Sequence, residues 1–373
     1  MRRYYDHRFS KRDQAGECRV AVTPSGIVEI NMQEWNAMKE AMFYEREAGD
    51  SVRCGLCRFR CLIGNGARGI CSVRENRDGV LSSLVYGKLC AEHVDPIEKK
   101  PLFHVMPGSR SYSIATVGCN FHCSHCQNYT ISQVDRHSPI GGKETSPREI
   151  VERALHHDCR SIAYTYTEPT IFYEFAYDTA RLAAEAGLKN IFVSNGYISS
   201  EALTAIAPYL HAANIDLKGF SERFYRDFVH ARLSEVLDSL VAYRRHGIWL
   251  EITTLVIPGL NDSEAELQGI AEFIVANLGA DTPWHVTQFY PTYKLTDRPR
   301  TPVETLRKAR DIGRAAGLRF VYEGNVPGEG GENTYCPSCS SLLIRRFGYV
   351  IEADRISNGA CPDCGASIAG IGL

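Results

Sequence analysis

Three compact groups of cysteines constrain the fold of this chain more than any other feature of its sequence. All but three of its 14 cysteines follow the patterns Cys-x2-Cys-x3-Cys-x9-Cys, Cys-x3-Cys-x2-Cys and Cys-x2-Cys-x21-Cys-x2-Cys. The groups are Cys54, Cys57, Cys61 and Cys71; Cys119, Cys123 and Cys126; and Cys336, Cys339, Cys361 and Cys364. The polar start MRRYYDHRFSKRDQ lacks the apolar core of a secretory signal, so we expect these cysteines to bind metals rather than to form disulfides.

The overall composition is that of a soluble globular protein, with 44% hydrophobic and 23% charged residues. Lys and Arg number 42 against 44 Asp and Glu, and the formal net charge of −2 does not support a nucleic-acid partner. No apolar run approaches the ~20 residues that cross a bilayer, so we expect a cytoplasmic protein without a membrane partner. The single cysteines Cys18, Cys90 and Cys159 are interpreted as small hydrophobic residues.

From residue 111 onward, β-branched apolar runs alternate with amphipathic stretches. Strands are expected at residues 111–117, 161–165, 190–194, 213–217, 249–257, 285–290 and 318–322. Helices are expected at residues 147–157, 171–186, 199–210, 262–276 and 302–316. This alternation predicts parallel βαβ units, and therefore an α/β fold built on a partial (β/α)6-type TIM barrel with its chemistry at the strand ends.

Three domains are expected along the chain. Residues 1–110 form an N-terminal region with a Cys-rich metal site, and a helix is predicted within it over residues 33–48. Residues 111–325 form the partial barrel, and a Gly-rich linker leads to a zinc-ribbon-like module at residues 326–373.

The central triplet directly follows the first predicted barrel strand. Its short spacings allow one loop to bring Cys119, Cys123 and Cys126 around an iron–sulfur cluster. A [4Fe–4S] cluster held by three cysteines leaves one iron open, and an open position is typical of a catalytic metal site. That iron could chelate the amine and carboxylate of S-adenosylmethionine. Zinc is the alternative, although it prefers four nearby ligands.

The triplet and the residues that follow it resemble the radical S-adenosylmethionine (radical SAM) superfamily. Gln127 and Asn128 resemble its activating-enzyme branch, which includes pyruvate formate-lyase activating enzymes. Further matches occur in order at Glu168-Pro169, Ser194-Asn195-Gly196, Asp216-Leu217-Lys218, TLVIPGLN at 254–261 and QFYP at 288–291. The resemblance implies that S-adenosylmethionine is anchored by Glu168, Ser194, Asn195, Asp216 and Lys218. The family's glycines before the glutamate are Tyr166 and Thr167 here.

Nearly the whole chain from about residue 50 is similar to the radical enzyme of the AmmeMemoRadiSam system. This similarity includes the segment DPIEKKPL at residues 95–102 and both flanking cysteine groups. Asp95, Glu98, Lys99 and Lys100 are expected to shape the floor of the active site, with a turn cap as the alternative.

The flanking groups carry separate predictions. The third group has zinc-ribbon spacing around a hairpin predicted at residues 342–351, so it predicts a structural zinc site, with rubredoxin-like iron as the rival. The first group fits structural zinc and an auxiliary [4Fe–4S] cluster equally well.

The resemblance implies a radical SAM oxidoreductase that reductively cleaves S-adenosylmethionine to a 5′-deoxyadenosyl radical and abstracts hydrogen from a substrate. Reduced ferredoxin or flavodoxin is the expected electron donor, and a partner protein is the substrate that an activating enzyme would take. The alternatives are stand-alone modification of a small molecule or RNA, and a non-enzymatic electron carrier with several clusters.

Overall fold

The computed structural model of the chain describes residues 21–23, 26–28 and 39–373, which divide into two compact units. In the first unit, Met1–Met38, strand β1 (Ala21–Thr23) pairs antiparallel with β2 (Gly26–Val28). The second unit, Lys39–Leu373, contains all three cysteine groups. Cys18 lies outside the described residues.

The helix predicted over residues 33–48 is wrong where the structure describes it, and its first residues lie outside the described part. Strands β3 (Lys39–Glu40) and β4 (Tyr44–Arg46) occupy this region instead. Between them, the backbone N–H of Met42 donates to the buried carboxylate of Glu174 at 2.7 Å. Partners distant in sequence therefore override the local helical preference.

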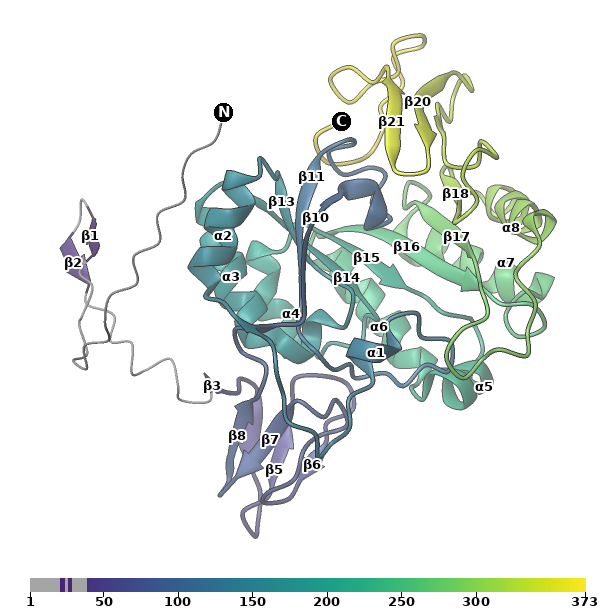
Figure 1. Cartoon of the computed structure of the whole chain (residues 1–373). Coiled ribbons are helices and arrows are strands. Elements are labelled where there is room, and N and C mark those ends of the chain that lie inside the picture. The colour runs from purple at the N-terminus through teal and green to yellow at the C-terminus, as the bar shows by residue number, and fades with distance from the viewer. Residues whose placement is uncertain (1–20, 24–25, 29–38) are drawn as a thin grey trace, which may run out of the picture. The chain divides into compact units, whose positions relative to one another are not determined.

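The largest sheet in the described residues has eight strands in the order β10-β11-β13-β14-β15-β16-β17-β18 (Figure 1). Strand β10 is antiparallel to β11, and the other seven are parallel to one another. The strands are β10 (Ala91–Pro96), β11 (Arg110–Ala115), β13 (Ser161–Tyr164), β14 (Lys189–Ser194), β15 (Ala212–Asp216), β16 (Trp249–Val256), β17 (Trp284–Gln288) and β18 (Val321–Gly324).

One longer helix follows each of the first six parallel strands. These helices are α2 (Pro147–His156), α3 (Tyr173–Glu185), α4 (Ser200–Ile206), α6 (Leu233–Arg245), α7 (Glu264–Phe273) and α8 (Val303–Ala315). Six strand–helix units and a final strand thus form an open parallel sheet with β10 and β18 at its edges, which confirms the predicted partial barrel. The shorter helices are α1 (Tyr129–Ser132) and α5 (Glu222–Phe224), and none of the described helices is long and apolar enough to cross a membrane.

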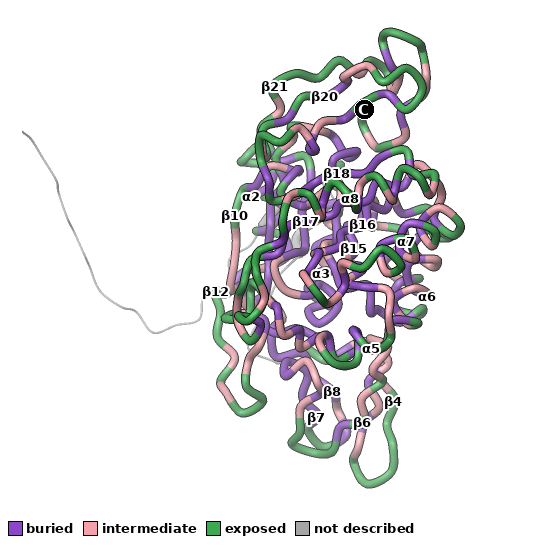
Figure 2. Tube along the Cα trace, turned by 90° about the vertical axis from the view of Figure 1, so that its right-hand side faces the viewer, coloured by how far each residue is buried: buried purple, intermediate pink, exposed green. Residues whose placement is uncertain are grey.

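The core lies between the sheet and its helices. Every residue of β13 and of β17 is buried, as expected for parallel strands covered on both faces, and Figure 2 shows the same for the centre of the sheet. Ser146 caps the N-terminus of helix α2. Its hydroxyl accepts from the N–H of Glu149, and the Glu149 carboxylate accepts from the N–H of Ser146. Its buried residues, including Ile150 and Ala154, face the sheet.

Strand β10 carries the chain from the N-terminal region to the base of the barrel. A short 3-10 turn, Ile97–Lys99, follows it. The carboxylate of Glu251 on β16 then accepts hydrogen bonds from the backbone N–H groups of Phe103 and His104, at 2.9 and 2.8 Å. His285 also contacts Glu251, at 2.7 Å, which places this histidine in a structural network at the opposite end of the strands from the cysteine triplet.

The N-terminal region contains two small antiparallel sheets. Their orders are β3-β8-β7 and β4-β5-β6, with β5 (Val52–Cys54), β6 (Leu62–Ile63), β7 (Arg74–Arg77) and β8 (Val80–Ser83). Strand β9 (Lys88–Leu89) pairs with β12 (Lys143–Glu144). The loop at Cys57 forms a β-bridge with Ile198, just after β14, so the first cysteine group is fixed to the barrel.

The C-terminal module is a three-stranded antiparallel sheet, β19 (Thr334–Tyr335), β20 (Leu342–Phe347) and β21 (Val350–Asp354), and it contains the predicted hairpin. Its buried Arg346 donates to the carbonyl oxygen of Phe103 at 2.9 Å and lies over the Phe103 ring at 4.3 Å. A small hydrophobic cluster joins the module to β18 through Phe320 and Tyr322.

Candidate functional site

A cavity of about 510 Å³ lies at the carboxyl ends of the barrel strands. Its walls include the central triplet and four of the five predicted anchoring residues: Cys119, Cys123, Cys126, Ser194, Asn195, Asp216 and Lys218. We call this space the central cavity. The fifth predicted residue, Glu168, lies behind this wall.

The triplet occupies the loop between β11 and α1, and the backbone of that loop is anchored at several points. The N–H of Ser124 donates to the carbonyl of Phe228 at 2.9 Å, and its carbonyl accepts from the N–H of Lys294 at 3.1 Å. Cys119 and Cys123 are buried, and burial raises the pKa of Cys123 to about 12. A bound metal would be needed to hold this side chain as a thiolate.

Glu168 organises the strand ends next to Cys119. Its fully buried carboxylate accepts from the Thr170 hydroxyl at 2.6 Å, from the Thr170 N–H at 3.0 Å and from the Ser194 hydroxyl at 2.8 Å. It also accepts from the N–H of Asn195 at 2.8 Å. Burial raises the pKa of Glu168, although these hydrogen bonds oppose the change. The carboxylate therefore positions Ser194 and Asn195, which themselves face the central cavity.

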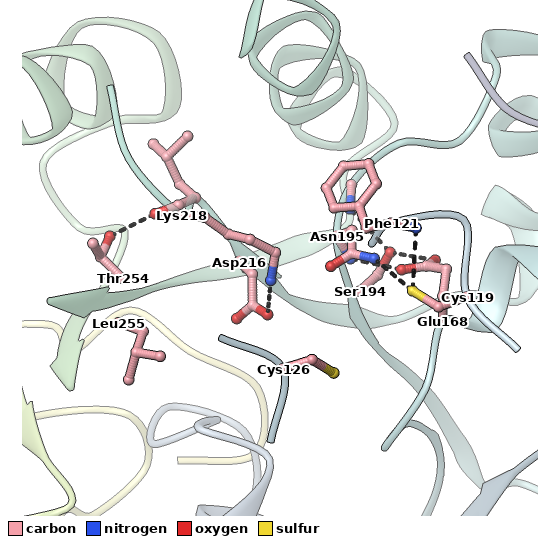
Figure 3. Close-up of polar contacts among 12 residues, drawn as sticks. Cys119, Phe121, Cys126, Glu168, Ser194, Asn195, Asp216, Lys218, Thr254 and Leu255 are labelled. Carbon is pink, nitrogen blue, oxygen red and sulfur yellow. Dashed lines mark hydrogen bonds and ion pairs between the residues drawn. The ribbon is translucent and has the colours of Figure 1, made fainter. Parts of the chain in front are cut away.

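Asn195 links this network to the cysteine loop. Its side-chain amide donates to the Cys119 sulfur at 3.4 Å, and the backbone N–H of Phe121 donates to the same sulfur at 3.3 Å (Figure 3). Such hydrogen bonds stabilise negative charge on a sulfur ligand. Gly196 follows with a φ of +68°, and a Cβ there would lie 2.7 Å from Ile215, so only glycine fits this turn.

Asp216 and Lys218 form an ion pair on another wall of the central cavity. Their Oδ2 and Nζ atoms lie 2.8 Å apart, and Figure 3 shows the Lys218 amine directed at the carboxylate. Burial by itself lowers the pKa of Lys218, but Asp216 and Cys123 outweigh that effect and raise it, so the ammonium stays charged. The carbonyl of Lys218 is held by the Asn261 side chain at 2.7 Å, which gives the TLVIPGLN segment a structural role.

Tyr166 has an unusual backbone conformation in the cavity wall. Its φ is +62°, in the left-handed region that favours the glycine it replaces, and such strain is most often found at functional sites. The side chain of Asn128 donates to the Tyr166 carbonyl at 2.7 Å, and the Tyr166 hydroxyl bonds to Asp95. Asn128, singled out beside the triplet, thus connects the cysteine loop to this turn.

The predicted floor residues divide into two sets. Lys99 and Lys100 line the central cavity, and the ammonium groups lie 2.8 and 2.6 Å from the Asp95 carboxylate. Burial lowers the pKa of Lys100 to about 8, with Asp95 opposing the change. Glu98 instead accepts from the N–H of Gly108 at 2.8 Å, which is a structural turn contact.

The two histidines within the cysteine loop have different environments. His122 contacts the Gln133 side chain at 2.7 Å and the Ile70 carbonyl at 3.3 Å, so it fixes the loop. His125 lines the central cavity and is buried, and this burial lowers its pKa to about 3. It is therefore a neutral imidazole at physiological pH.

The C-terminal cysteines come together in a compact set. Their four sulfurs all lie within 4.8 Å of one another, and the closest pairs, Cys336–Cys364 and Cys339–Cys361, are 3.6 and 3.7 Å apart. Both Cys-x2-Cys turns have the same backbone, since the N–H of Ser340 donates to Cys336 and that of Gly365 to Cys361, each at 2.9 Å. The structure thus confirms that these residues form one site.

Comparison with known proteins agrees with this site. Residues 113–272 match the Radical SAM superfamily, and an uncharacterised protein of Methanocaldococcus jannaschii is 47% identical over 89% of this chain and 99% of its own length. A protein of the same organism with the provisional name of a glycyl-radical enzyme activating enzyme is 23% identical over 55% of this chain and 77% of its own length. The chain belongs to the radical SAM superfamily, and it is an enzyme of that class.

Two solved structures are also similar in part. A domain of a pyruvate-formate lyase-activating enzyme from Bacteroides vulgatus is 16% identical, with a TM-score of 0.40 over 44% of this chain and 99% of that domain. A radical SAM methyltransferase from Sphaerobacter thermophilus is 17% identical, with a TM-score of 0.48 over 63% of this chain and 71% of its own.

The superfamily implies a [4Fe–4S] cluster and S-adenosylmethionine, and the residues present fit both. Three cysteine thiols enter one cavity, which leaves a position for a ligand that the protein does not supply. The same cavity presents the Asp216–Lys218 pair and the buried hydroxyl of Thr253, which has no hydrogen-bond partner among the described residues. A zwitterionic ligand suits such a wall.

Proposed function

We propose that the chain is a radical SAM enzyme that reductively cleaves S-adenosylmethionine and abstracts hydrogen from a substrate in the central cavity. When bound, the cluster supplies one electron that breaks a sulfonium C–S bond, giving methionine and a 5′-deoxyadenosyl radical. The observation that carries this proposal is that the cysteine triplet, Ser194, Asn195, Asp216 and Lys218 line one cavity. The superfamily membership argues against the simple electron carrier.

The protein's own residues have distinct parts in this proposal. Lys218 and Asp216 offer opposite charges to the carboxylate and the amine of the sulfonium donor. Ser194 and Asn195 offer polar groups at the end of β14, and Glu168 is proposed to act through them as a positioning residue, because it lies outside the cavity wall. Thr165 and Thr167 line the cavity beside this turn.

The proposed substrate is a partner protein, as in an activating enzyme. The relative from Methanocaldococcus jannaschii with the provisional activating-enzyme name supports this class. Next to Asn128 at the cavity, the rings of Tyr129 and Tyr293 stack at 4.6 Å, and Tyr129 is 38% exposed. A partly exposed aromatic pair of this kind suits contact with a polypeptide. The proposed donor of the single electron is ferredoxin or flavodoxin.

The C-terminal site is proposed to hold structural zinc. Four sulfurs about 2.3 Å from one zinc ion lie about 3.8 Å from each other, and the observed 3.6 and 3.7 Å agree with this. A single iron ion requires the same sulfur spacing, so metal analysis of the purified protein decides between zinc and iron. One zinc per chain, with no more iron than sulfide, supports zinc.

Binding of S-adenosylmethionine tests the proposed site directly. The electron paramagnetic resonance signal of the reduced, reconstituted protein should change when S-adenosylmethionine is added. In Lys218→Met, a higher concentration should be needed for the same change, whereas the exposed control Lys308→Met should behave like the wild type. An unchanged signal in the wild type would contradict the proposal.

A further inference from the structure

The first cysteine group surrounds a second cavity. Cys54, Cys57, Cys61 and Cys71 all line it. Most of the remaining wall is apolar: Leu56, Phe59, Ile63, Ile70 and Ile171. We call this space the N-terminal cysteine pocket, and we propose that it binds an auxiliary [4Fe–4S] cluster in which every iron has a cysteine ligand.

The spacing of the sulfurs separates this pocket from the C-terminal site. Among the described residues, the C-terminal set is the only group with three or more potential ligand atoms within 4.8 Å of one another. The sulfurs of the first group are therefore too far apart for one zinc ion, which would require about 3.8 Å. In a four-iron cluster each thiolate binds a different iron, so the sulfurs stand further apart around a larger core.

The central triplet provides an internal comparison. Among the described residues, its three sulfurs are likewise not all within 4.8 Å of one another, and the superfamily assigns a [4Fe–4S] cluster to them. The first group thus matches the iron–sulfur ligands of the same chain, and it differs from the compact C-terminal set.

The backbone around the pocket is anchored in this open arrangement. The N–H of Cys54 donates to the carbonyl of Cys61 at 2.9 Å, and Cys57 is bridged to Ile198. The N–H of Ser199 donates to the carbonyl of Leu56 at 3.0 Å. These contacts fix the backbone positions from which the cysteine side chains enter the pocket.

Two buried side chains that line the pocket each carry an N–H donor without a hydrogen-bond partner. Arg74 is 2% exposed and Asn120 is 1% exposed, and both line the pocket. The Nε of Arg74 and the Nδ2 of Asn120 have no hydrogen-bond partner in the part of the chain that the structure describes. Buried donors are rarely left unpaired, and the sulfides and thiolates of a cluster accept such hydrogen bonds.

The pocket lies next to the central triplet, but its four cysteines give its cluster a different role. Asn120 lies between the pocket and the ligand Cys119, and its Oδ1 accepts from Asn195 at 3.3 Å. Four cysteine ligands leave no open iron, so this cluster would not chelate S-adenosylmethionine, in contrast to the central one. The inference stands on the cysteine geometry and is independent of the proposed reaction.

Metal analysis of the whole protein tests the inference. After anaerobic reconstitution with iron and sulfide, the wild type should contain about eight irons, about eight sulfides and about one zinc per chain. About four irons with about two zincs would overturn the inference. This measurement needs no variant, so a failure of a variant to fold cannot obscure it.

A variant without the three central cysteines tests the N-terminal cysteine pocket by itself. Cys119→Ser/Cys123→Ser/Cys126→Ser should keep about four irons and four sulfides, with a Mössbauer spectrum that S-adenosylmethionine leaves unchanged. Loss of all iron from this variant, with the C-terminal zinc retained as a sign of folding, would overturn the inference. A wild type that holds about eight irons and never cleaves S-adenosylmethionine would overturn only the proposed function.

The reciprocal variant completes the test. Cys57→Ser/Cys71→Ser should lose about four irons and keep the central cluster and the zinc, whereas the control Cys90→Ser, outside the three groups, should keep all metals. Full iron content in the double variant would contradict the assignment.

Discussion

At the scale of single residues, buried polar groups define the site more than exposed charges do. Glu168 has no exposed surface, yet four hydrogen bonds tie its carboxylate to Thr170 in its own turn and to Ser194 and Asn195 at the end of β14. The family resemblance implies direct contact of Glu168 with S-adenosylmethionine; we propose that it acts through Ser194 and Asn195, because it is not among the residues that line the central cavity. The energetic importance of Glu168 comes from leaving its partners unpaired if it is changed.

Glu168→Gln should therefore destabilise both the protein and the site. The introduced amide NH2 group faces the N–H and O–H donors that the carboxylate accepts from in the wild type. This should lower the free energy of unfolding by about 1–3 kcal/mol, and it should weaken S-adenosylmethionine binding about tenfold. Differential scanning calorimetry and a binding titration measure the two effects. The exposed control Glu185→Gln should change neither, and an unaltered Glu168→Gln protein would show that the network is unimportant.

Lys100 predicts a pH dependence of stability. Its pKa of about 8 in the folded protein lies below the ordinary 10.5 because the side chain is buried. Between these values the unfolded chain binds a proton that the folded chain has released, so this group's contribution to the free energy of unfolding rises with pH, by at most about 3 kcal/mol. Below pH 8 Lys100 is protonated in both the folded and the unfolded chain, so the folded chain carries the full cost of burying the charged amine.

Urea unfolding at about pH 7.5 and about pH 9.5 checks this sign. Relative to Lys100→Met, the wild type should gain stability at the higher pH. The subtraction removes groups that titrate in both proteins, and an equal pH response of the two proteins would refute the assignment.

At the scale of elements, the cysteine loop depends on the backbone of Gly118. This residue connects β11 to the triplet with a φ of +100°, and a Cβ there would lie 2.6 Å from Val73 and 3.0 Å from the carbonyl of Cys71. Two cysteine groups thus meet at one glycine. The central and N-terminal metal sites should consequently respond together to a change at this position.

Gly118→Ala should lower the melting temperature and the iron content. The left-handed backbone costs about 1–2 kcal/mol, and the clash adds about 1–3 kcal/mol. Gly187→Ala is the matched control, because its φ is +80° and a Cβ would meet nothing within 4 Å. A Gly118→Ala protein no less stable than this control would contradict the argument, as judged by calorimetry and iron analysis.

The sequence predicts some elements well for a physical reason. Strands such as β13 and β17 are buried on both faces, so their continuous apolar runs are visible without the structure. The edge strand β10, AEHVDP, contains Glu92 and Asp95, exposes His93 and Val94, and has no such apolar run, so it was not predicted. Helix α6 was also missed, although its buried residues Leu233, Val236, Leu240 and Tyr243 recur at helical spacing.

The site shows the same division. The cysteine groups are visible from their spacing, and the Asp216–Lys218 pair follows from the family resemblance because its residues form one short motif. The network of Glu168 and the position of Lys100 depend on which strand ends become neighbours, and only the fold defines these contacts. The two N–H donors of the N-terminal cysteine pocket that have no partner among the described residues, on Arg74 and Asn120, carry no sequence signal for the same reason.

At the scale of the molecule, the C-terminal module supports the base of the barrel. Arg346 donates to the carbonyl of Phe103, and Phe103 belongs to the buried cluster that includes Cys336 and Cys361. Metal binding and packing against the barrel are therefore coupled, because the same small core contains two of the ligands.

Removing the C-terminal metal should destabilise this module. Cys336→Ser/Cys361→Ser should lose about one zinc per chain and at least several kcal/mol of stability, since metal affinity contributes to folding. The central cluster should remain, and the control Cys159→Ser should keep its zinc. Zinc analysis and limited proteolysis measure the outcome, and an equally protected module in the double variant would contradict the coupling.

The central claim is that the triplet and its cavity cleave S-adenosylmethionine, and one assay tests it most directly. The reconstituted protein is incubated anaerobically with dithionite and S-adenosylmethionine, and 5′-deoxyadenosine is measured by chromatography. The wild type and Cys90→Ala should form this product, and Cys119→Ala should form none. Equal product from Cys119→Ala, or no product from a wild type with an intact cluster and bound S-adenosylmethionine, would contradict the claim.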